Sequence, residues 1–352
     1  MGITVIQALV DGLLIGGVYA AIGLGLSLAY GVMGVVNWAH GEVLMVSMFI
    51  SLYMTKYAGV DPYLTAIVNV VVMGACGFFL QKFVFNKMIN RSDKAWRDIM
   101  LFTCGMSIFL QALFNMIFGA PAQSVNTRYS GMFHVGSIMV SIPKTISFII
   151  AAAVCVGLYL LIMHTEMGRS LRATSQDRST AQLMGINANF VYCLCFAISL
   201  AVVGIAAALL TPFYSVTPYV GAAFCFKSFI IVALGGKGNI PGAMVAGIII
   251  GIIEKVGAVL WGASIAQVII FIMFIVILLE MCIRDSQPPG LCLPDLPPGQ
   301  GAERSGREAA ERHPGVRRVR FRLQDRHARP GDPRRGQYPR PGAVRLPHER
   351  GL

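Results

Sequence analysis

The feature that most constrains the fold is a succession of long apolar runs between residues 5 and 280. A bilayer core about 30 Å thick is crossed by a helix of roughly 20 apolar residues, and most of these runs reach that length. The length rule predicts membrane helices over residues 5–30, 35–55, 63–85, 99–119, 145–163, 190–211, 222–235, 241–260 and 264–280. We therefore expect an all-α polytopic membrane protein with about 8–9 transmembrane helices. The run 222–235 is short, which favours a re-entrant or half helix enclosed by protein.

Composition supports this class of protein. Only 13% of the 352 residues are charged, whereas soluble domains carry about 25%, and the mean hydropathy is +0.66. The N-terminal run lacks the basic flank of a signal peptide and is longer than the apolar region of one. We predict that this run is the first membrane helix and not a cleaved leader.

The basic loops predict which end of the protein faces the cytoplasm. Residues 86–98 and 164–189 each carry several Lys or Arg residues, and short loops of this kind stay on the cytoplasmic side. Two predicted spans separate the loops, so both should lie at the same end. The N-terminus and residues 120–143 are then expected outside, where alternation within residues 137–144 predicts a short strand pair.

Residues 164–189 form the longest polar interval between the apolar runs. The interval has a basic excess, with Arg169, Arg172 and Arg178 set against Glu166 and Asp177. Its middle predicts an amphipathic helix that stops at Gly185, because glycine ends helices readily. We expect the arginines to pair with acidic groups on a soluble partner. The alternative is a solvated cytoplasmic loop.

Two G-x-x-x-G patterns lie inside apolar runs. Gly12 and Gly16 form the first pattern, and Gly247 and Gly251 form the second. Small residues let helix backbones approach closely in lipid. Both patterns therefore predict helix packing, either within the chain or at a subunit interface, and neither has the context of a nucleotide-binding fingerprint.

The segment NWAHGE, residues 37–42, brings polar groups to the start of the second apolar run. Such groups are costly at membrane depth and usually face protein or water. Helical spacing would put Asn37, His40 and Gly41 on one face, with Glu42 pointing elsewhere. Three interpretations remain open: a helix start with Asn37 as N-cap, a place in the translocation path, or a proton relay.

The charged residues Glu254 and Lys255 lie late in their apolar run. Long charged side chains near the end of a membrane helix can reach the interface while their stems stay in the apolar layer. We expect both side chains to extend toward the outer surface.

The sequence offers no pattern of catalytic residues. It has no Ser/His/Asp set, no carboxylate pair and no phosphate-binding loop, so we expect a protein that is not an enzyme. The eight cysteines include no C-x-x-C pair, and six lie in apolar runs where a small, soft side chain packs well. We predict no metal site and no cofactor.

Three separated stretches resemble one known family. Residues 12–45, 168–187 and 234–251 are similar, in the same order, to the permease subunits of branched-chain amino-acid ABC importers of the leucine/isoleucine/valine type. The resemblance covers about residues 5–280, and the family also includes urea and amide permeases. It implies an all-helical subunit of the bacterial inner (plasma) membrane that translocates leucine, isoleucine and valine while other chains hydrolyse ATP.

The resemblance also implies partners. These are a second homologous permease subunit, two cytoplasmic ATPase subunits and a periplasmic substrate-binding protein, all working around the lipid bilayer and without nucleic acid. The coupling helix that docks on the ATPase is expected within residues 164–189. Such importers show an E-A-A-x-x-x-G pattern there, of which this chain keeps Ala181 and Gly185. The expected coupling residues are Arg169, Arg172, Asp177, Arg178, Ala181 and Gly185.

Two alternative functions stay open. The first is a permease of the same family for urea, short amides or other amino acids. The second is a stand-alone secondary transporter, which inverted repeats, broken helices and charged midplane sites would favour. The small number of charges within the apolar runs and the long polar loop favour the importer.

The composition changes after Glu280. Residues 281–352 hold 15 Arg, no Lys and 11 of the 17 prolines, and residues 281–286 (MCIRDS) resemble the translation of a transposon end used in sequencing libraries. We interpret residues 1–280 as the permease domain and residues 281–352 as an artefactual or disordered tail, because such a composition buries too little apolar surface to fold. The functional alternative is a basic tail that binds anionic lipid or nucleic acid.

Overall fold

The computed structural model describes residues 2–91, 95–125, 131–135 and 138–285, and the statements below concern these residues. Residues 1–284 form one compact unit. The tail expected over residues 281–352 lies outside the described residues from residue 286 onward.

The described part of the chain contains seven helices that are long and apolar enough to cross a membrane. They are α1 (Gly2–Met33), the continuous run of α3 (Thr65–Leu80), the π-helical turn η1 (Gln81–Phe85) and α4 (Asn86–Arg91), α5 (Ala95–Phe118), α6 (Ile142–His164), α9 (Ala188–Leu210), α11 (Ile240–Trp261) and α12 (Ala263–Asp285). Two shorter apolar helices, α2 (His40–Ala58) and α10 (Val220–Gly235), complete the unit. The predicted all-α polytopic fold is confirmed, because each predicted apolar segment coincides with a helix.

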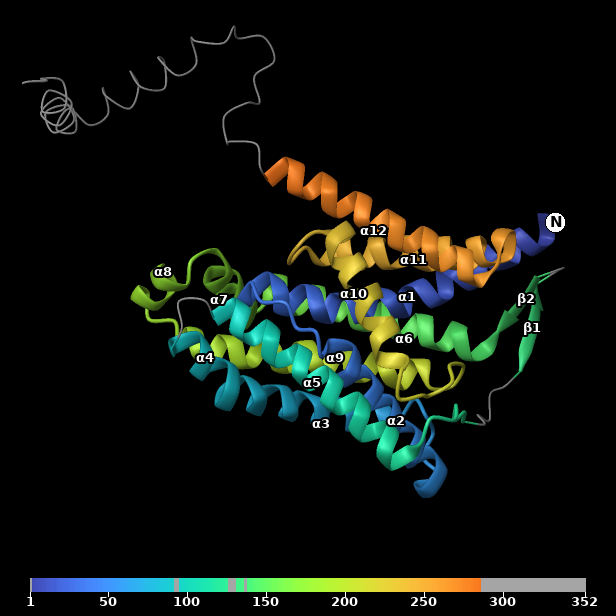
Figure 1. Cartoon of the computed structure of the whole chain (residues 1–352), viewed down its shortest axis with the longest axis horizontal. Helices are drawn as coiled ribbons and strands as arrows, with labels where there is room; N and C mark the ends of the chain where they lie inside the picture. Colours follow the sequence, from blue (N-terminus) through green and yellow to red (C-terminus); the bar gives the residue numbers. More distant parts are fainter. Residues whose placement is uncertain (1, 92–94, 126–130, 136–137, 286–352) are drawn as a thin grey trace, which may run out of the picture. The chain divides into compact units, whose positions relative to one another are not determined.

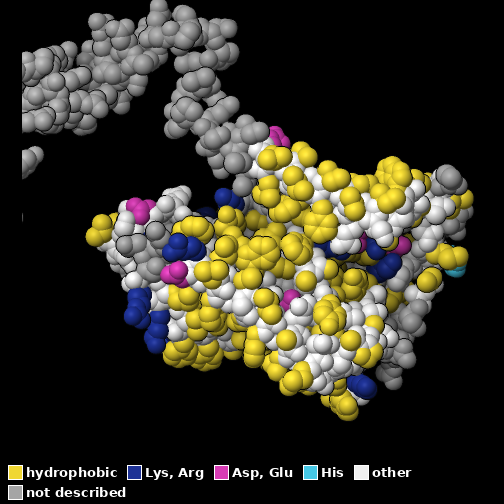
Figure 2. Space-filling view, in the orientation of Figure 1, with side chains coloured by type: hydrophobic (Ala, Val, Ile, Leu, Met, Phe, Trp, Pro, Cys, Tyr) yellow, Lys and Arg dark blue, Asp and Glu magenta, His cyan; other side chains and the backbone are white. Residues whose placement is uncertain are grey.

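Helix α1 is the centre of the unit. It packs against α11, α9, α6 and α10, and its apolar core is almost entirely buried. Helix α3 packs on the other side of α9 (Figure 1). By contrast, α5 and α12 expose most of their apolar side chains, and the face seen in Figure 2 is largely apolar. An apolar surface of this extent suits a lipid or subunit environment and not water.

The two G-x-x-x-G patterns meet at the contact between α1 and α11. A Cβ added to Gly12 would lie 2.7 Å from the Cα of Ile252, and one added to Gly16 would lie 2.8 Å from the Cα of Ile248. From the other side, a Cβ on Gly251 would lie 2.7 Å from the backbone nitrogen of Gly16. The structure therefore uses these glycines for close packing within the chain.

Helices α2 and α10 begin inside the unit instead of at its ends. The His40 ring nitrogen Nε2 lies 3.2 Å from the carbonyl oxygen of Ile22, which is about 16 Å along α1 from its end at Met33. The first turn of α10 touches the first turn of α2 at Gly41 and Gly221. Helix α10 is about 24 Å long, too short to cross about 30 Å of hydrocarbon. It is the half helix that its short apolar run predicts.

Polar elements lie at the two ends of the unit. Helices α7 (Glu166–Gln176) and α8 (Arg178–Leu183) lie beside α4 at one end, and the N-terminus and the hairpin of β1 (Met132–Val135) and β2 (Ile138–Ser141) lie at the other (Figure 1). The strands pair antiparallel, which confirms the predicted strand pair. An ion pair of 2.9 Å between Lys144 and Asp11 joins the starts of α6 and α1 at the hairpin end.

Candidate coupling region and translocation path

The polar loop folds into two short helices with a sharp bend between them. Thr165 caps α7, because its hydroxyl accepts a hydrogen bond from the backbone N–H of Gly168 at 3.1 Å. Asp177 caps α8 in the same way and accepts from the backbone N–H of Ser179 at 2.8 Å. Capping side chains satisfy the free N–H groups that begin every helix. The bend is therefore encoded by two local polar contacts.

Hydroxyl groups fix the charge on Asp177. The side chain accepts hydrogen bonds from the hydroxyls of Thr180 and Ser179, at 2.5 Å and 2.7 Å. The Thr180 hydroxyl, followed by the Ser179 hydroxyl and backbone, lowers the pKa of Asp177 to about 2. At its far end α8 stops at Gly185, whose φ of 84° is accessible to glycine without strain. The polar loop is therefore a bent pair of short helices, called the knuckle below, in which Asp177 and Gly185 mark the two ends of α8.

Two of the three arginines of the loop turn back to their own chain. Arg172 donates to the carbonyl oxygen of Ile162, at the end of α6. Arg178 donates to the side-chain oxygens of Asn90 at 2.8 Å and Asn189 at 3.0 Å. In this conformation both side chains bind within the chain, and their pairing with acidic groups of a partner stays a prediction. Arg169 is exposed and pairs with Glu166 at 3.2 Å.

The contact between Arg178 and Asn90 also fixes topology. Asn90 belongs to α4, in the other basic loop, so the two basic loops lie at the same end of the unit. This confirms the predicted common side of the two loops.

The end of the knuckle exposes two large apolar side chains. Ala181 is buried, whereas Leu183 is 87% exposed and Met184 is 80% exposed at the end of α8. Exposed apolar surface surrounded by polar residues is typical of protein interaction sites, so the end of α8 is a candidate for one. Sequence reasoning missed them because they follow the polar turns of α8. The signal that could have found them is the adjacent large apolar pair directly before the helix-ending glycine.

The segment before α2 differs from its prediction. Helix α2 begins at His40, Ala39 occupies the N-cap position, and Asn37 lies outside the helix. The Asn37 side-chain oxygen instead accepts from the backbone N–H of Ala39 at 3.0 Å. Asn37 is thus not the N-cap, and it shares no helical face with His40 and Gly41, because the chain is turned before His40.

Gly41 and Glu42 lie together against the start of α10. A Cβ on Gly221 would lie 2.5 Å from Oε2 of Glu42, and Gly41 packs directly on the Gly221 carbonyl. Glu42 accepts a long hydrogen bond of 3.4 Å from the Ser107 hydroxyl of α5. Both glycines are needed because the two helix starts touch backbone to backbone. The structure thus joins Gly41 and Glu42, which the helical-face argument had separated, and directs His40 toward α1.

A second polar cluster lies deep among α1, α10 and α11. Lys227 and Glu254 form an ion pair of 2.8 Å, with side chains 11% and 21% exposed. The Tyr19 hydroxyl accepts from Lys227 Nζ at 3.0 Å and donates to Glu254 Oε1 at 3.2 Å. The expectation that Glu254 extends to the outer surface is wrong, because a cation inside the unit holds it. Sequence reasoning missed Lys227, although a lysine in an apolar run is itself a signal.

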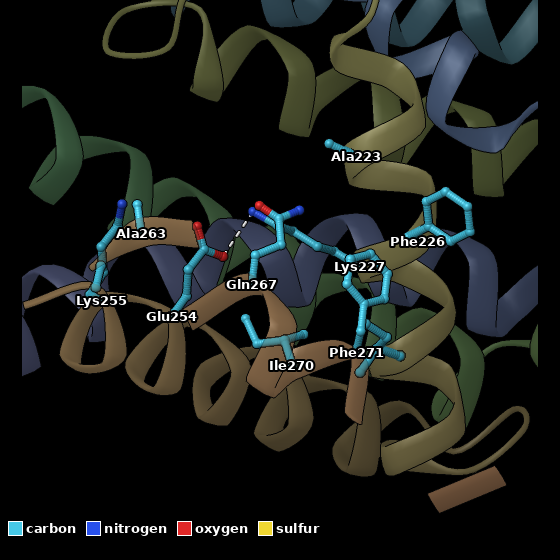
Figure 3. Close-up of a pocket in the computed structure, with 11 residues that line it drawn as sticks. Ala223, Phe226, Lys227, Glu254, Lys255, Ala263, Gln267, Ile270 and Phe271 are labelled. Atoms are coloured by element: carbon cyan, nitrogen blue, oxygen red, sulfur yellow. Dashed lines mark ion pairs between the residues drawn. The ribbon is translucent and has the colours of Figure 1, made fainter. Parts of the chain in front are cut away.

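A pocket of about 110 Å³ opens beside this cluster. Helices α10, α11 and α12 line it, Lys227 and Glu254 meet at its wall, and Gln267 of α12 also lines it (Figure 3). The rest of the lining is Lys255 and apolar side chains, among them Phe226, Ile270 and Phe271. The pocket therefore combines the Lys227–Glu254 ion pair and a second cation, Lys255, with an otherwise mostly apolar lining.

Residues 8–278 match the sequence profile of a family described as the permease component of branched-chain amino acid transport systems. The chain belongs to this permease family. The match includes the knuckle, α2, the half helix α10 and the polar cluster. The permease is a multi-pass membrane protein, and its family consists of transport permeases and not of enzymes.

Named relatives are similar over most of the permease. It is 32% identical to the high-affinity branched-chain amino acid transport system permease protein BraD of Pseudomonas aeruginosa over 289 residues, 78% of this chain and 93% of the relative. It is 31% identical to the corresponding protein LivH of Escherichia coli K12, with 78% and 93% covered. The D-allose transport system permease protein AlsC of the same organism is 27% identical, with 66% of this chain and 70% of the relative covered.

Proposed function

We propose that the permease is one membrane-spanning subunit of an ATP-driven importer that moves leucine, isoleucine and valine across a bacterial inner membrane. It would act with a second homologous permease, two cytoplasmic ATPase subunits and a periplasmic binding protein. Family membership and the names of the relatives at 31–32% identity support the substrate class. The relative named for D-allose supports a shared architecture that carries other solutes.

The observation that carries the ATP-driven mechanism is the apolar end of α8. Leu183 and Met184 are almost fully exposed, and burying one large apolar side chain contributes about 1.5–3 kcal/mol. The caps at Thr165 and Asp177 keep this end at a defined angle to α6. We infer that Leu183 and Met184 dock in a groove of the ATPase, while Arg172 and Arg178 transmit its movement to α6 and α9.

The coupling follows from these contacts. Arg172 joins α7 to the end of α6, and Arg178 joins α8 to α4 and α9. A displacement of the knuckle by the ATPase would therefore move three membrane helices together. ATP shifts the balance between outward-open and inward-open states only as far as the ATPase binds the two states unequally.

Uptake into proteoliposomes tests the substrate and the energy source together. The full chain is reconstituted with the second permease, the ATPases and the binding protein from the same source, and leucine, urea and D-allose are offered separately as labelled solutes. We expect uptake of leucine that requires ATP. Uptake of urea or D-allose in place of leucine would support the importer but contradict the proposed substrate. Uptake by this chain without ATPases would identify a secondary transporter.

A further inference from the structure

The ion pair between Lys227 and Glu254 is expensive where it lies. Tyr19 and Glu254 are each about 21 Å along their helices from the ends that meet the knuckle side, so the pair lies inside the apolar layer of a bilayer about 30 Å thick, roughly two thirds of the way across from that side. Removing two charges from water often costs more than their attraction returns, and an apolar replacement is commonly as stable or more stable. Packing alone therefore does not explain the pair.

The surroundings of the pair are organised around its charges. Lys227 Nζ lies 4.7 Å from the ring centre of Tyr19 and 5.3 Å from that of Phe224, so two aromatic faces support the cation. Tyr19 links the two charged groups through its hydroxyl. Both partners nevertheless retain access to the pocket between α10, α11 and α12. The cation and the anion are thus held in place and presented to one cavity (Figure 3).

The pocket restricts the kind of ligand. Its apolar lining, with Phe226, Ile270 and Phe271, suits an aliphatic group. Its volume of about 110 Å³ corresponds to about four water molecules, at about 30 Å³ each in the liquid, so the pocket suits a small ligand. A ligand with a single charge would satisfy one partner and leave the other unpaired in a low-dielectric site, which costs several kcal/mol. A zwitterion offers a partner to both Lys227 and Glu254 and leaves the net charge of the site, which also includes Lys255, unchanged.

We propose that Lys227 and Glu254, supported by Tyr19, form a binding site within the membrane for the zwitterionic head of an aliphatic amino acid. The ion pair opens to admit the ligand, Lys227 and the Tyr19 hydroxyl bind its carboxylate, and Glu254 binds its ammonium group. The side chain of the ligand packs between Phe226, Ile270 and Phe271. When the ligand leaves, the pair closes again and neutralises itself. This inference rests on the proposed function, because it names the substrate site of the same permease.

The test compares direct binding in variants of the full chain. The complex with the second permease and the ATPases, without binding protein, is purified, and retention of radiolabelled leucine is measured at equilibrium. We expect leucine to be displaced by unlabelled isoleucine but not by isoamylamine, which lacks the carboxylate, or by 4-methylpentanoate, which lacks the ammonium group. Equal displacement by either single-charge analogue, or no retention of leucine by the unaltered complex, would overturn the proposal.

Paired substitutions separate binding from a structural clamp. In K227Q/E254Q both charges are removed, and we expect leucine binding and leucine uptake per ATP to fall at least about tenfold, equivalent to about 1.4 kcal/mol, while complex yield is retained. If the ion pair only held the helices together, K227Q/E254Q should retain leucine binding and uptake, because removing both buried charges restores a neutral, packed interface. The matched control is K144Q/D11N, which neutralises the ion pair between α6 and α1 at the hairpin end and should leave binding unchanged.

A size variant keeps the charges in place. Ala258 lines the pocket, and A258L would fill part of its apolar space while leaving Lys227 and Glu254 intact. We expect leucine binding to fall and alanine binding to persist, since both share the zwitterionic head. If K227Q/E254Q failed to assemble, unchanged leucine binding in A258L would still contradict the site. A complex that takes up no leucine even with ATP and binding protein would instead refute the proposed function.

Discussion

At the scale of single residues, Asp177 has the clearest local role in the knuckle. It accepts from the backbone and hydroxyl of Ser179 and from the hydroxyl of Thr180. Its pKa is lowered from 3.8 to about 2, so the stabilisation of α8 is present above pH 4 and is lost as the pH falls toward 2. Between pH 5 and pH 8 Asp177 stays ionised, and the knuckle should not change with pH through this group.

Substitution of Asp177 tests the cap. D177A removes the acceptor, and we expect faster amide hydrogen exchange over residues 178–183, measured by mass spectrometry on the purified permease. D177N is the matched control, because Asn caps helices about as well as Asp, and exchange should stay close to that of the unaltered chain. Equal exchange in D177A and the unaltered chain, at pH 5 and at pH 8, would show that Asp177 does not hold α8.

At the scale of elements, the contact between α1 and α11 depends on the absence of side chains. A Cβ on Gly251 would meet the backbone of Gly12 and Gly16, whereas a Cβ on Gly157 of α6 has no atom within 4 Å. Alanine favours a helix over glycine by about 0.5–1 kcal/mol, but overpacking costs about 1–3 kcal/mol. The two substitutions should therefore act in opposite directions.

We predict that G251A lowers the thermal unfolding midpoint of the detergent-purified permease, and that G157A leaves it unchanged or raises it. Fluorescence-monitored thermal unfolding of both variants in one detergent provides the comparison. An unchanged unfolding midpoint in G251A would mean that α1 and α11 can move apart without loss of stability. A lowered midpoint in G157A would mean that α6 packs more closely than the structure shows.

The sequence predicts the helices well because their signal is local. The length of each apolar run was enough to locate each helix. The small number of apolar residues in 222–235 already indicated the half helix α10. The start of α2 was harder to predict from the sequence, because Asn37 fits a capping pattern. Only the tertiary contact of His40 with Ile22 shows where the helix begins. The pairing of Lys227 with Glu254 joins positions on two helices, which no local pattern reveals. The partners of Arg172 and Arg178 are likewise tertiary.

At the scale of the whole molecule, the permease unit and the C-terminal tail are separable by composition. The family match ends at residue 278, and α12 continues to Asp285. We propose that residues 286–352 contribute nothing to transport, because their Arg- and Pro-rich composition cannot bury enough apolar surface to form a core. A chain ended after Asp285 should match the full chain in membrane yield and in leucine uptake. If the shortened chain lost uptake, and anionic lipid raised uptake only in the full chain, the tail would instead be a lipid-binding segment.

The most direct measurement is ATP-dependent leucine uptake by the complete complex, compared between the unaltered chain and L183A/M184A. M167A is the matched control, because Met167 is also an exposed methionine, on α7 instead of the end of α8. We predict that uptake requires ATP and the ATPases, that L183A/M184A lowers it at least about tenfold, equivalent to about 1.4 kcal/mol, and that M167A retains it. Leucine uptake by this chain without ATPases, or full uptake by L183A/M184A, would contradict the account of α8 as the element that couples ATP to transport.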